Sequence, residues 1–250
     1  MTQQQTRLNK KQRRALRDQG VKVNNEANFR VNFNLREIKP LTENQQKTFE
    51  AFSAKKNLML HGIAGTGKSF ISLYLSLKEL FDGNCGYNKI YIIRSVVPTR
   101  DMGFLPGNQK EKAKVYEAPY YAICAELFNR GDAYDVLKTK DYIEFISTSF
   151  VRGITLNNCI VIVDEVANMT LHELDSIITR FGKNCRIIFC GDFRQSDFTY
   201  DKDKKGLIDF MKILKNMKAF NFIDFNVDDI VRSSLVKEYI IAKDRLQITA

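Results

Sequence analysis

One glycine-rich segment constrains the fold of this 250-residue chain more than any other feature. Residues 62–69 read GIAGTGKS, an apolar run at 57–60 precedes them, and a stretch of helical character at about 68–81 follows. A glycine loop of this spacing, placed between a strand and a helix, turns consecutive backbone N–H groups inward around a phosphate. We therefore predict a nucleotide site in which Lys68 reaches the β- and γ-phosphates and Ser69 contacts Mg²⁺, the alternative being a glycine turn that binds nothing. The residues assigned to the nucleotide are Gly62, Ile63, Ala64, Gly65, Thr66, Gly67, Lys68 and Ser69.

Short apolar runs alternate with helical stretches after about residue 40. Strands made almost entirely of Ile, Val and Tyr, separated by helices, are typical of a parallel sheet covered on both faces. The sequence therefore predicts an α/β domain over 40–250, preceded by a basic arm over 1–39 that includes a short strand at 29–35. We expect strands at 57–60, 89–94, 142–147, 159–164, 185–190 and 219–225, and helices at 68–81, 117–130, 171–181, 206–217 and 233–243.

Composition limits the partners and the chemistry. The 39 Lys and Arg against 29 Asp and Glu give a net charge of +10, which favours polyanionic partners. No run approaches the roughly 18–20 apolar residues of a membrane span, and the amino terminus lacks an apolar signal core, so we expect a cytoplasmic protein without a membrane partner. Five Cys without a C-x-x-C pair predict free thiols. Two His without ligand spacing argue against a zinc centre or a Ser–His–Asp triad.

A second motif supplies the acidic half of the predicted site. The apolar strand at 159–164 ends in Asp164 and is followed by Glu165, and open α/β sheets bind ligands at the carboxyl ends of their strands. We expect Asp164 to hold Mg²⁺ together with Ser69. Glu165 is expected to orient and deprotonate the attacking water, which favours hydrolysis over transfer to another acceptor.

A third motif, GDFRQSD at 191–197, follows the next predicted strand. Its Gln195 is suited to contacting both the γ-phosphate and the attacking water. The alternative is a polar loop without a catalytic role.

Taken together, these segments resemble the PhoH family. The likeness is carried by HGIAGTGKS, by residues 94–112 (RSVVPTRDMGFLPGNQKEK), and by VDEVANMT, TRFG, GDFRQSD and DIVRS, in the family's order between about residues 42 and 239. The family consists of ATPases related to the first RecA-like domain of superfamily 1 helicases. The resemblance therefore implies a three-layer RecA-like fold with a mostly parallel sheet, and ATP hydrolysis linked to RNA or other nucleic acid.

The resemblance also implies roles for residues outside the glycine loop. Thr42 and Gln45 match the family's adenine-reading element, and Arg94 and Arg100 match a stretch that faces single-stranded nucleic acid in helicase relatives. Between Arg7 and Lys22, seven basic side chains against one acid leave two interpretations open, a nucleic-acid-binding arm or a solvated tail.

Two positions depart from the family pattern. Ala167 stands where the family has a glutamine that helps to couple the nucleotide state to nearby loops. Ile154 stands where an arginine is common, which removes one phosphate contact.

The function that these observations favour is a Mg²⁺-dependent ATPase that acts on, or is regulated by, RNA or single-stranded DNA. A P-loop kinase for a small molecule and a slow nucleotide-dependent switch or scaffold are the alternatives. One RecA-like domain cannot close on a second, so helicase-like unwinding would need another subunit. With a single RecA-like domain, we expect a neighbouring subunit to donate an arginine to the γ-phosphate, and Arg232 and Arg180 are the candidates. Head-to-tail contacts of this type close into rings, and the resemblance points to a homo-oligomer that is a hexameric ring.

Overall fold

In the computed structural model, residues 34–83, 86–96, 109–192 and 201–246 are described, and the chain divides into units at 1–34 and 35–250. All elements named below belong to the second unit. Its strands are β1 (Asn57–Gly62), β2 (Lys89–Arg94), β3 (Ile143–Ser147), β4 (Cys159–Asp164), β5 (Cys185–Gly191) and β6 (Phe220–Phe225). Its helices are α2 (Glu43–Ser53), α3 (Lys68–Asp82), α4 (Gln109–Phe128), α5 (Ala133–Thr139), α6 (Leu171–Ile178), α7 (Asp201–Lys215) and α8 (Ser234–Arg245), with 3-10 turns η3 (Thr148–Phe150), η4 (Val166–Asn168) and η5 (Val227–Asp229).

The strands form one six-stranded sheet in the order β3-β2-β4-β5-β1-β6, and each neighbouring pair is parallel. Their β-branched and aromatic residues pack well on a pleated surface. β4 is buried along its whole length, as expected of a central strand covered on both faces. The parallel arrangement brings the carboxyl ends of β1 and β4 to one edge of the sheet, with β5 between them.

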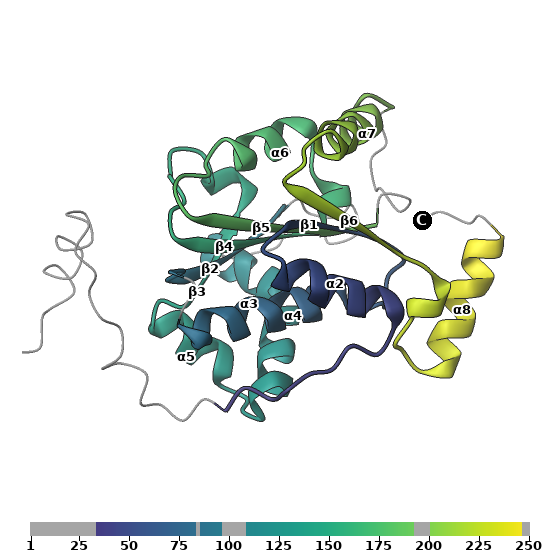
Figure 1. Cartoon of the computed structure of the whole chain (residues 1–250), viewed down its shortest axis with the longest axis horizontal. Coiled ribbons are helices and arrows are strands. Elements are labelled where there is room, and N and C mark those ends of the chain that lie inside the picture. Colours follow the sequence, from purple (N-terminus) through teal and green to yellow (C-terminus); the bar gives the residue numbers. More distant parts are fainter. Residues whose placement is uncertain (1–33, 84–85, 97–108, 193–200, 247–250) are drawn as a thin grey trace, which may run out of the picture. The chain divides into compact units, whose positions relative to one another are not determined.

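Helices cover both faces of the sheet, with α6 and α7 on one face and α2, α3, α4 and α5 on the other (Figure 1). On the first face, Phe189 of β5 meets Phe210 of α7 edge-on, with ring centroids 5.3 Å apart. Both rings are buried in a core cluster with Val161 and Leu174. The predicted three-layer α/β fold with a parallel sheet is confirmed. In the part of the chain that the structure describes, no helix is long and apolar enough to cross a membrane.

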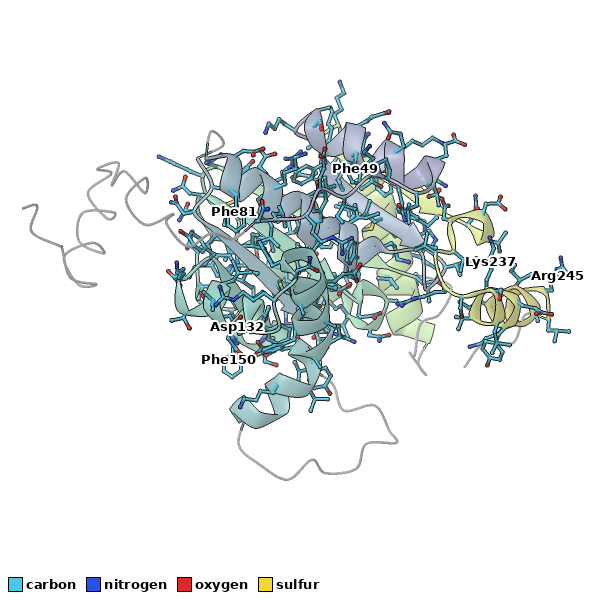
Figure 2. The ribbon with its side chains drawn as sticks, turned by 90° about the horizontal axis from the view of Figure 1, so that it is seen from below. Phe49, Phe81, Asp132, Phe150, Lys237 and Arg245 are labelled. Carbon is cyan, nitrogen blue, oxygen red and sulfur yellow. The ribbon has the colours of Figure 1, made fainter. Side chains whose placement is uncertain are left out.

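Helix α8 stands out from these layers, and Figure 2 labels Lys237 and Arg245 along it. None of the α8 side chains that the structure describes is buried. Leu235 and Tyr239 are 75% and 67% exposed.

Helix α2 was not predicted, because its buried stripe contains polar residues. Gln45 and Thr48 are buried there beside Ala51 and Phe52. This stripe has helical spacing, but apolar periodicity marks only its second half.

Several other elements also differ from the prediction. Helix α4 begins at Gln109 rather than near 117, so Pro119, a residue most common in the first turn of a helix, lies inside it. The short helix α5 was not predicted, and α6 ends at Ile178, three residues early. Of the strand expected at 29–35, residues 29–33 lie outside the described residues, and 34–35 are not in a strand.

The cysteines that the structure describes carry free thiols, as predicted. Cys124, Cys159 and Cys190 are buried, and Cys185 is half-buried. Cys85 lies outside the described residues.

Candidate nucleotide site

The glycine loop runs from the end of β1 into the first turn of α3. Gly62, Gly65 and Gly67 have φ angles of 125°, 80° and 83°, which residues with a Cβ rarely adopt. A Cβ on Gly62 would also lie 1.9 Å from the carbonyl oxygen of Phe225 in β6, so this position has no room for a side chain. The loop leads directly into the N-terminus of a 15-residue helix, where an anion is stabilised.

Lys68 folds back onto the loop that precedes it. Its Nζ donates to the carbonyl oxygens of Gly62 and Ile63, both at 2.7 Å, and to Oγ1 of Thr66 at 3.3 Å. Burial lowers the pKa of Lys68, although nearby acidic groups, Asp192 among them, oppose this shift. A desolvated ammonium held by neutral oxygens is suited to binding a phosphate.

Ser69 joins the glycine loop to the acidic strand. Its Oγ donates to Oδ1 of Asp164 at 2.9 Å, and Asp164 is buried at the end of β4. Oδ1 also accepts from the backbone N–H of Glu165 at 3.1 Å, and Oδ2 accepts from the hydroxyl of Tyr120 at 2.8 Å. A serine hydroxyl beside a carboxylate fits Mg²⁺, which takes one or two protein oxygens and completes its shell with water and phosphate. Within the described ranges, no group of three or more His, Cys, Asp or Glu could hold a metal ion by itself.

Glu165 differs from Asp164 in exposure and in backbone conformation. Its side chain is 49% exposed, and its Oε1 lies 3.8 Å from Nη2 of Arg94. Its φ angle is 55°, a conformation that costs about 1–3 kcal/mol in a residue with a Cβ and that concentrates at functional sites. Arg94 pairs in register with Asp164 across β2 and β4, so both acids and the arginine lie at one edge of the sheet.

Gln45 contacts the glycine loop from α2. Its buried side-chain amide donates to the carbonyl oxygen of Thr66 at 3.1 Å and accepts from the backbone N–H of Leu41 at 2.7 Å. Thr42 caps α2 by accepting from the backbone N–H of Gln45. Both ends of the Gln45 amide are engaged by the chain, so Gln45 braces the phosphate loop. Adenine reading by Thr42 and Gln45 stays a prediction.

A buried carboxylate ties α2 to the segment that precedes α8. Asp229 accepts from the side-chain amide of Asn44 at 2.7 Å and from the backbone N–H of Asn226 at 2.9 Å. Burial alone would raise the pKa of Asp229, but hydrogen bonds from Asn44, Thr42 and the backbone outweigh it and hold the pKa below its usual value.

The DIVRS segment, residues 229–233, lies against the glycine loop of its own chain. The N–H of Val231 donates to the carbonyl oxygen of Gly65 at 3.1 Å. A Cβ on Gly65 would lie 3.0 Å from Cγ of Arg232 and 3.5 Å from Cδ1 of Ile240 in α8. Arg232 is therefore beside its own phosphate loop, and its donation to a neighbouring subunit stays a prediction.

Arg180 lies at the opposite end of the sheet. Its carbonyl oxygen accepts from the N–H of Leu156 at 2.9 Å, just before β4 begins. The six residues of β4 then span roughly 20 Å to reach Asp164. Within one chain, the structure does not bring Arg180 to the glycine loop.

Two predicted site residues, Arg100 and Gln195, lie outside the described residues. Of the GDFRQSD motif, the structure describes Gly191, the last residue of β5, and Asp192, which follows it, between the ends of β1 and β4. Asp192 is buried.

The two residues that depart from the family pattern, Ala167 and Ile154, are both apolar. Ala167 is 2% exposed, and its backbone nitrogen lies 3.2 Å from where a Cβ on Gly191 would be. Ile154 is partly buried against the core cluster.

Two residues that contact the site's acids, Tyr120 and Asn44, were not predicted from the sequence. Thr42 followed three residues later by Gln45 is a helix-start pattern that could have placed Asn44 in the first turn of α2. No sequence signal pairs Tyr120 with Asp164, because that contact depends on how α4 packs.

Comparison with solved structures finds similarity at low identity. The chain is similar to the large terminase of a thermophilic bacteriophage, with 13% identity and a TM-score of 0.48, over 80% of this chain and 50% of that one. It is also similar to the Pif1 helicase of Candida albicans, with 14% identity and a TM-score of 0.40, over 84% and 44% of the two chains.

Sequence comparison identifies relatives with higher identity. The family model described as PhoH-like protein matches residues 37–243. A PhoH-like protein of Synechocystis is 30% identical over 85% of this chain and 64% of its own length, and one of Bacillus subtilis is 32% identical over 76% and 60%. The chain thus spans less than two thirds of these relatives. With most of its length matched by the model, and with the glycine loop and acidic strand joined in one site, the chain belongs to the PhoH family.

Proposed function

We propose that this chain is a Mg²⁺-dependent ATPase whose activity is coupled to binding or remodelling RNA or single-stranded DNA. The observation that carries the proposal is the 2.9 Å hydrogen bond from Ser69 in the glycine loop to Asp164 at the end of β4. It joins the phosphate-binding and metal-binding halves of a P-loop NTPase in one site.

The chemistry begins with an exchange of partners at Lys68. Its ammonium leaves the carbonyl oxygens of the loop and donates to the β- and γ-phosphates of ATP. Ser69 and Asp164 would hold Mg²⁺, which would neutralise phosphate charge.

Glu165 is the proposed base. Its exposed carboxylate next to the buried Asp164 supports a role in orienting and deprotonating water, and the strained backbone at this position fits a functional constraint. Gln195 is proposed to contact the γ-phosphate and that water. Arg232 beside Gly65 is proposed to stabilise the charge that develops on the γ-phosphate.

The nucleic-acid surface is proposed at the same edge of the sheet. Arg94 at the end of β2, 3.8 Å from Glu165, supports a link between a bound strand and the proposed base. Arg100 and the basic stretch between Arg7 and Lys22 would add phosphate contacts, and the net charge of +10 agrees with a polyanionic partner.

Assembly completes the proposal. The residues that the structure describes form one RecA-like sheet, and we propose that a neighbouring copy supplies a second surface in a homo-oligomer, a hexameric ring in the cytoplasm, with Arg180 available to a neighbouring site. Two other functions remain as alternatives, a P-loop kinase and a slow switch or scaffold. The switch is favoured by Ala167, whose buried methyl group lacks the coupling amide of the family.

One experiment tests the proposal against both alternatives. Phosphate release from ATP is measured with Mg²⁺, with and without single-stranded RNA or DNA, at two salt concentrations, using Lys68→Ala as the inactive control. We expect phosphate release without any acceptor, and stimulation by nucleic acid that weakens at higher salt. Release only in the presence of a small-molecule acceptor would favour the kinase, and nucleotide binding with negligible release would favour the switch.

A further inference from the structure

Tyr120 of α4 contacts the proposed metal ligand directly. Its side chain is 1% exposed, and its hydroxyl donates to Oδ2 of Asp164 at 2.8 Å. The other carboxylate oxygen, Oδ1, accepts from Ser69 and from the backbone N–H of Glu165. The carboxylate is held at both oxygens, so it cannot rotate without losing a buried hydrogen bond.

The same face of α4 reaches the second acidic residue through an arginine. Tyr116 lies one helical turn before Tyr120, so the two rings share a face of the helix. The guanidinium of Arg94 lies 5.9 Å from the ring centroid of Tyr116 and within 3.8 Å of Glu165. Helix α4 therefore contacts Asp164 directly and Glu165 through Arg94.

We propose that Tyr120 is a positioning residue that sets the Mg²⁺ affinity of the site by fixing the carboxylate of Asp164. This inference rests on the proposed function, because it requires Asp164 to be a metal ligand. With Oδ2 bound to the tyrosine, Oδ1 stays beside the Ser69 hydroxyl, where both oxygens can bind one ion. Without the hydroxyl, Oδ2 loses its side-chain donor in a buried setting, and the carboxylate turns toward another partner.

The test uses Tyr120→Phe, which removes only the hydroxyl oxygen of Tyr120. Binding of a fluorescent ATP analogue to Tyr120→Phe is titrated with Mg²⁺ and is also measured in EDTA. We expect the Mg²⁺ concentration for half-maximal enhancement of binding to rise about 10-fold, while affinity in EDTA stays at the wild-type value. Tyr120→Met, which also lacks the hydroxyl, should show the same change.

Tyr121→Phe is the matched control. Tyr121 is the next residue of α4, and its hydroxyl also donates to a carboxylate, that of Asp135 at 2.7 Å, but on the exposed side of the helix. This variant should match the wild type. In an Asp164→Asn background, Tyr120→Phe should cause no further change, because a positioning residue acts through the ligand that it positions.

The outcomes separate this inference from the proposed function. The positioning role would be overturned if Tyr120→Phe and Tyr121→Phe required the same Mg²⁺ concentration for half-maximal enhancement of binding. It would also be overturned if Tyr120→Phe lost the same affinity for the ATP analogue in Mg²⁺ and in EDTA. Wild-type binding that is indifferent to Mg²⁺ would leave ATP binding standing and overturn both the metal role of Asp164 and this inference. A wild type that binds no ATP analogue would overturn the proposed function itself.

Discussion

The ammonium group of Lys68 is partly buried, and its hydrogen-bond acceptors in the loop are neutral oxygens. A charge in that setting is costly until an anion reaches it, so the lysine favours phosphate strongly. We predict that Lys68→Ala weakens binding of a fluorescent ATP analogue about 100-fold, as expected for the loss of charge-assisted hydrogen bonds. Lys68→Arg, which keeps the charge but changes its shape, is the comparison. Wild-type affinity in Lys68→Ala would remove Lys68 from the site.

Glu165 should behave differently, because its role is in the chemical step. Glu165→Gln keeps the shape and removes the base, so we predict ATP affinity within about threefold of wild type and hydrolysis lowered about 100-fold or more. Phosphate release and analogue binding are measured on the same preparations. A wild-type rate of hydrolysis in Glu165→Gln would assign the base to another residue.

The predicted site residues that the structure brings together are those whose chemistry allows few substitutes. Lys68, Ser69 and Asp164 follow from loop spacing and from the end of an apolar strand, and the structure brings them together. Tyr120 could not be predicted, because a tyrosine in a helix with little amphipathic pattern acquires its partner only when the helix packs.

Among elements, α2 and η5 are joined by one buried carboxylate, Asp229, whose pKa is lowered by its hydrogen bonds. A carboxyl group with a folded-state pKa below its unfolded value adds stability above the unfolded value, about 3.9, and loses it as pH falls through the folded value. The contact therefore stabilises the junction at neutral pH. It also helps to place the DIVRS segment against the glycine loop.

We predict that Asn44→Ala lowers the free energy of unfolding by about 1–2 kcal/mol at pH 7. The difference from wild type should shrink below about pH 4, because protonation of Asp229 removes the same interaction in the wild type. Urea denaturation at pH 7, 5 and 3.5 measures this, with Gln46→Ala on the exposed side of α2 as the control. A difference that is constant with pH would mean that Asn44 stabilises the helix without acting on Asp229.

Elements with continuous apolar runs were predicted almost to the residue, β2 and β4 among them. Helix α2 was not, because buried Gln45 and Thr48 interrupt its apolar stripe. These two residues are polar because one braces the phosphate loop and the other bonds to the backbone of its own helix. The polar residues that these contacts require thus interrupt the apolar pattern from which helix α2 would have been predicted.

For the whole molecule, the net positive charge predicts that the affinity for single-stranded nucleic acid falls as the salt concentration rises. Each phosphate contact on a single strand contributes roughly 0.7 to the slope of log affinity against log salt. We predict that deleting residues 1–22 lowers this slope by about two units or more, as expected if at least three of its seven basic side chains contact the strand. Fluorescence anisotropy of labelled single strands at several salt concentrations measures the slope. An unchanged slope would make the segment a solubility feature.

The position of Arg232 beside its own Gly65 predicts the result of mixing subunits. Arg232→Ala and Lys68→Ala proteins, each inactive alone, are combined and assayed for ATP hydrolysis after co-assembly is verified. The position of Arg232 favours catalysis by a lysine and an arginine of one chain over the donation between chains expected from the sequence, so we predict no recovery. Recovered hydrolysis would show that the arginine is donated between chains, as expected from the sequence for a single RecA-like domain.

The glycine loop depends on residues that come much later in the chain. Gly62 is packed beneath the carbonyl group of Phe225, and the carbonyl oxygen of Gly65 accepts from the N–H of Val231. Synthesis proceeds at about 5–20 residues per second, so these partners leave the ribosome on the order of ten seconds after the loop itself. Until then β1 has no neighbour on its β6 side. A nascent chain should consequently acquire ATP binding only after Phe225 and Val231 have left the ribosome.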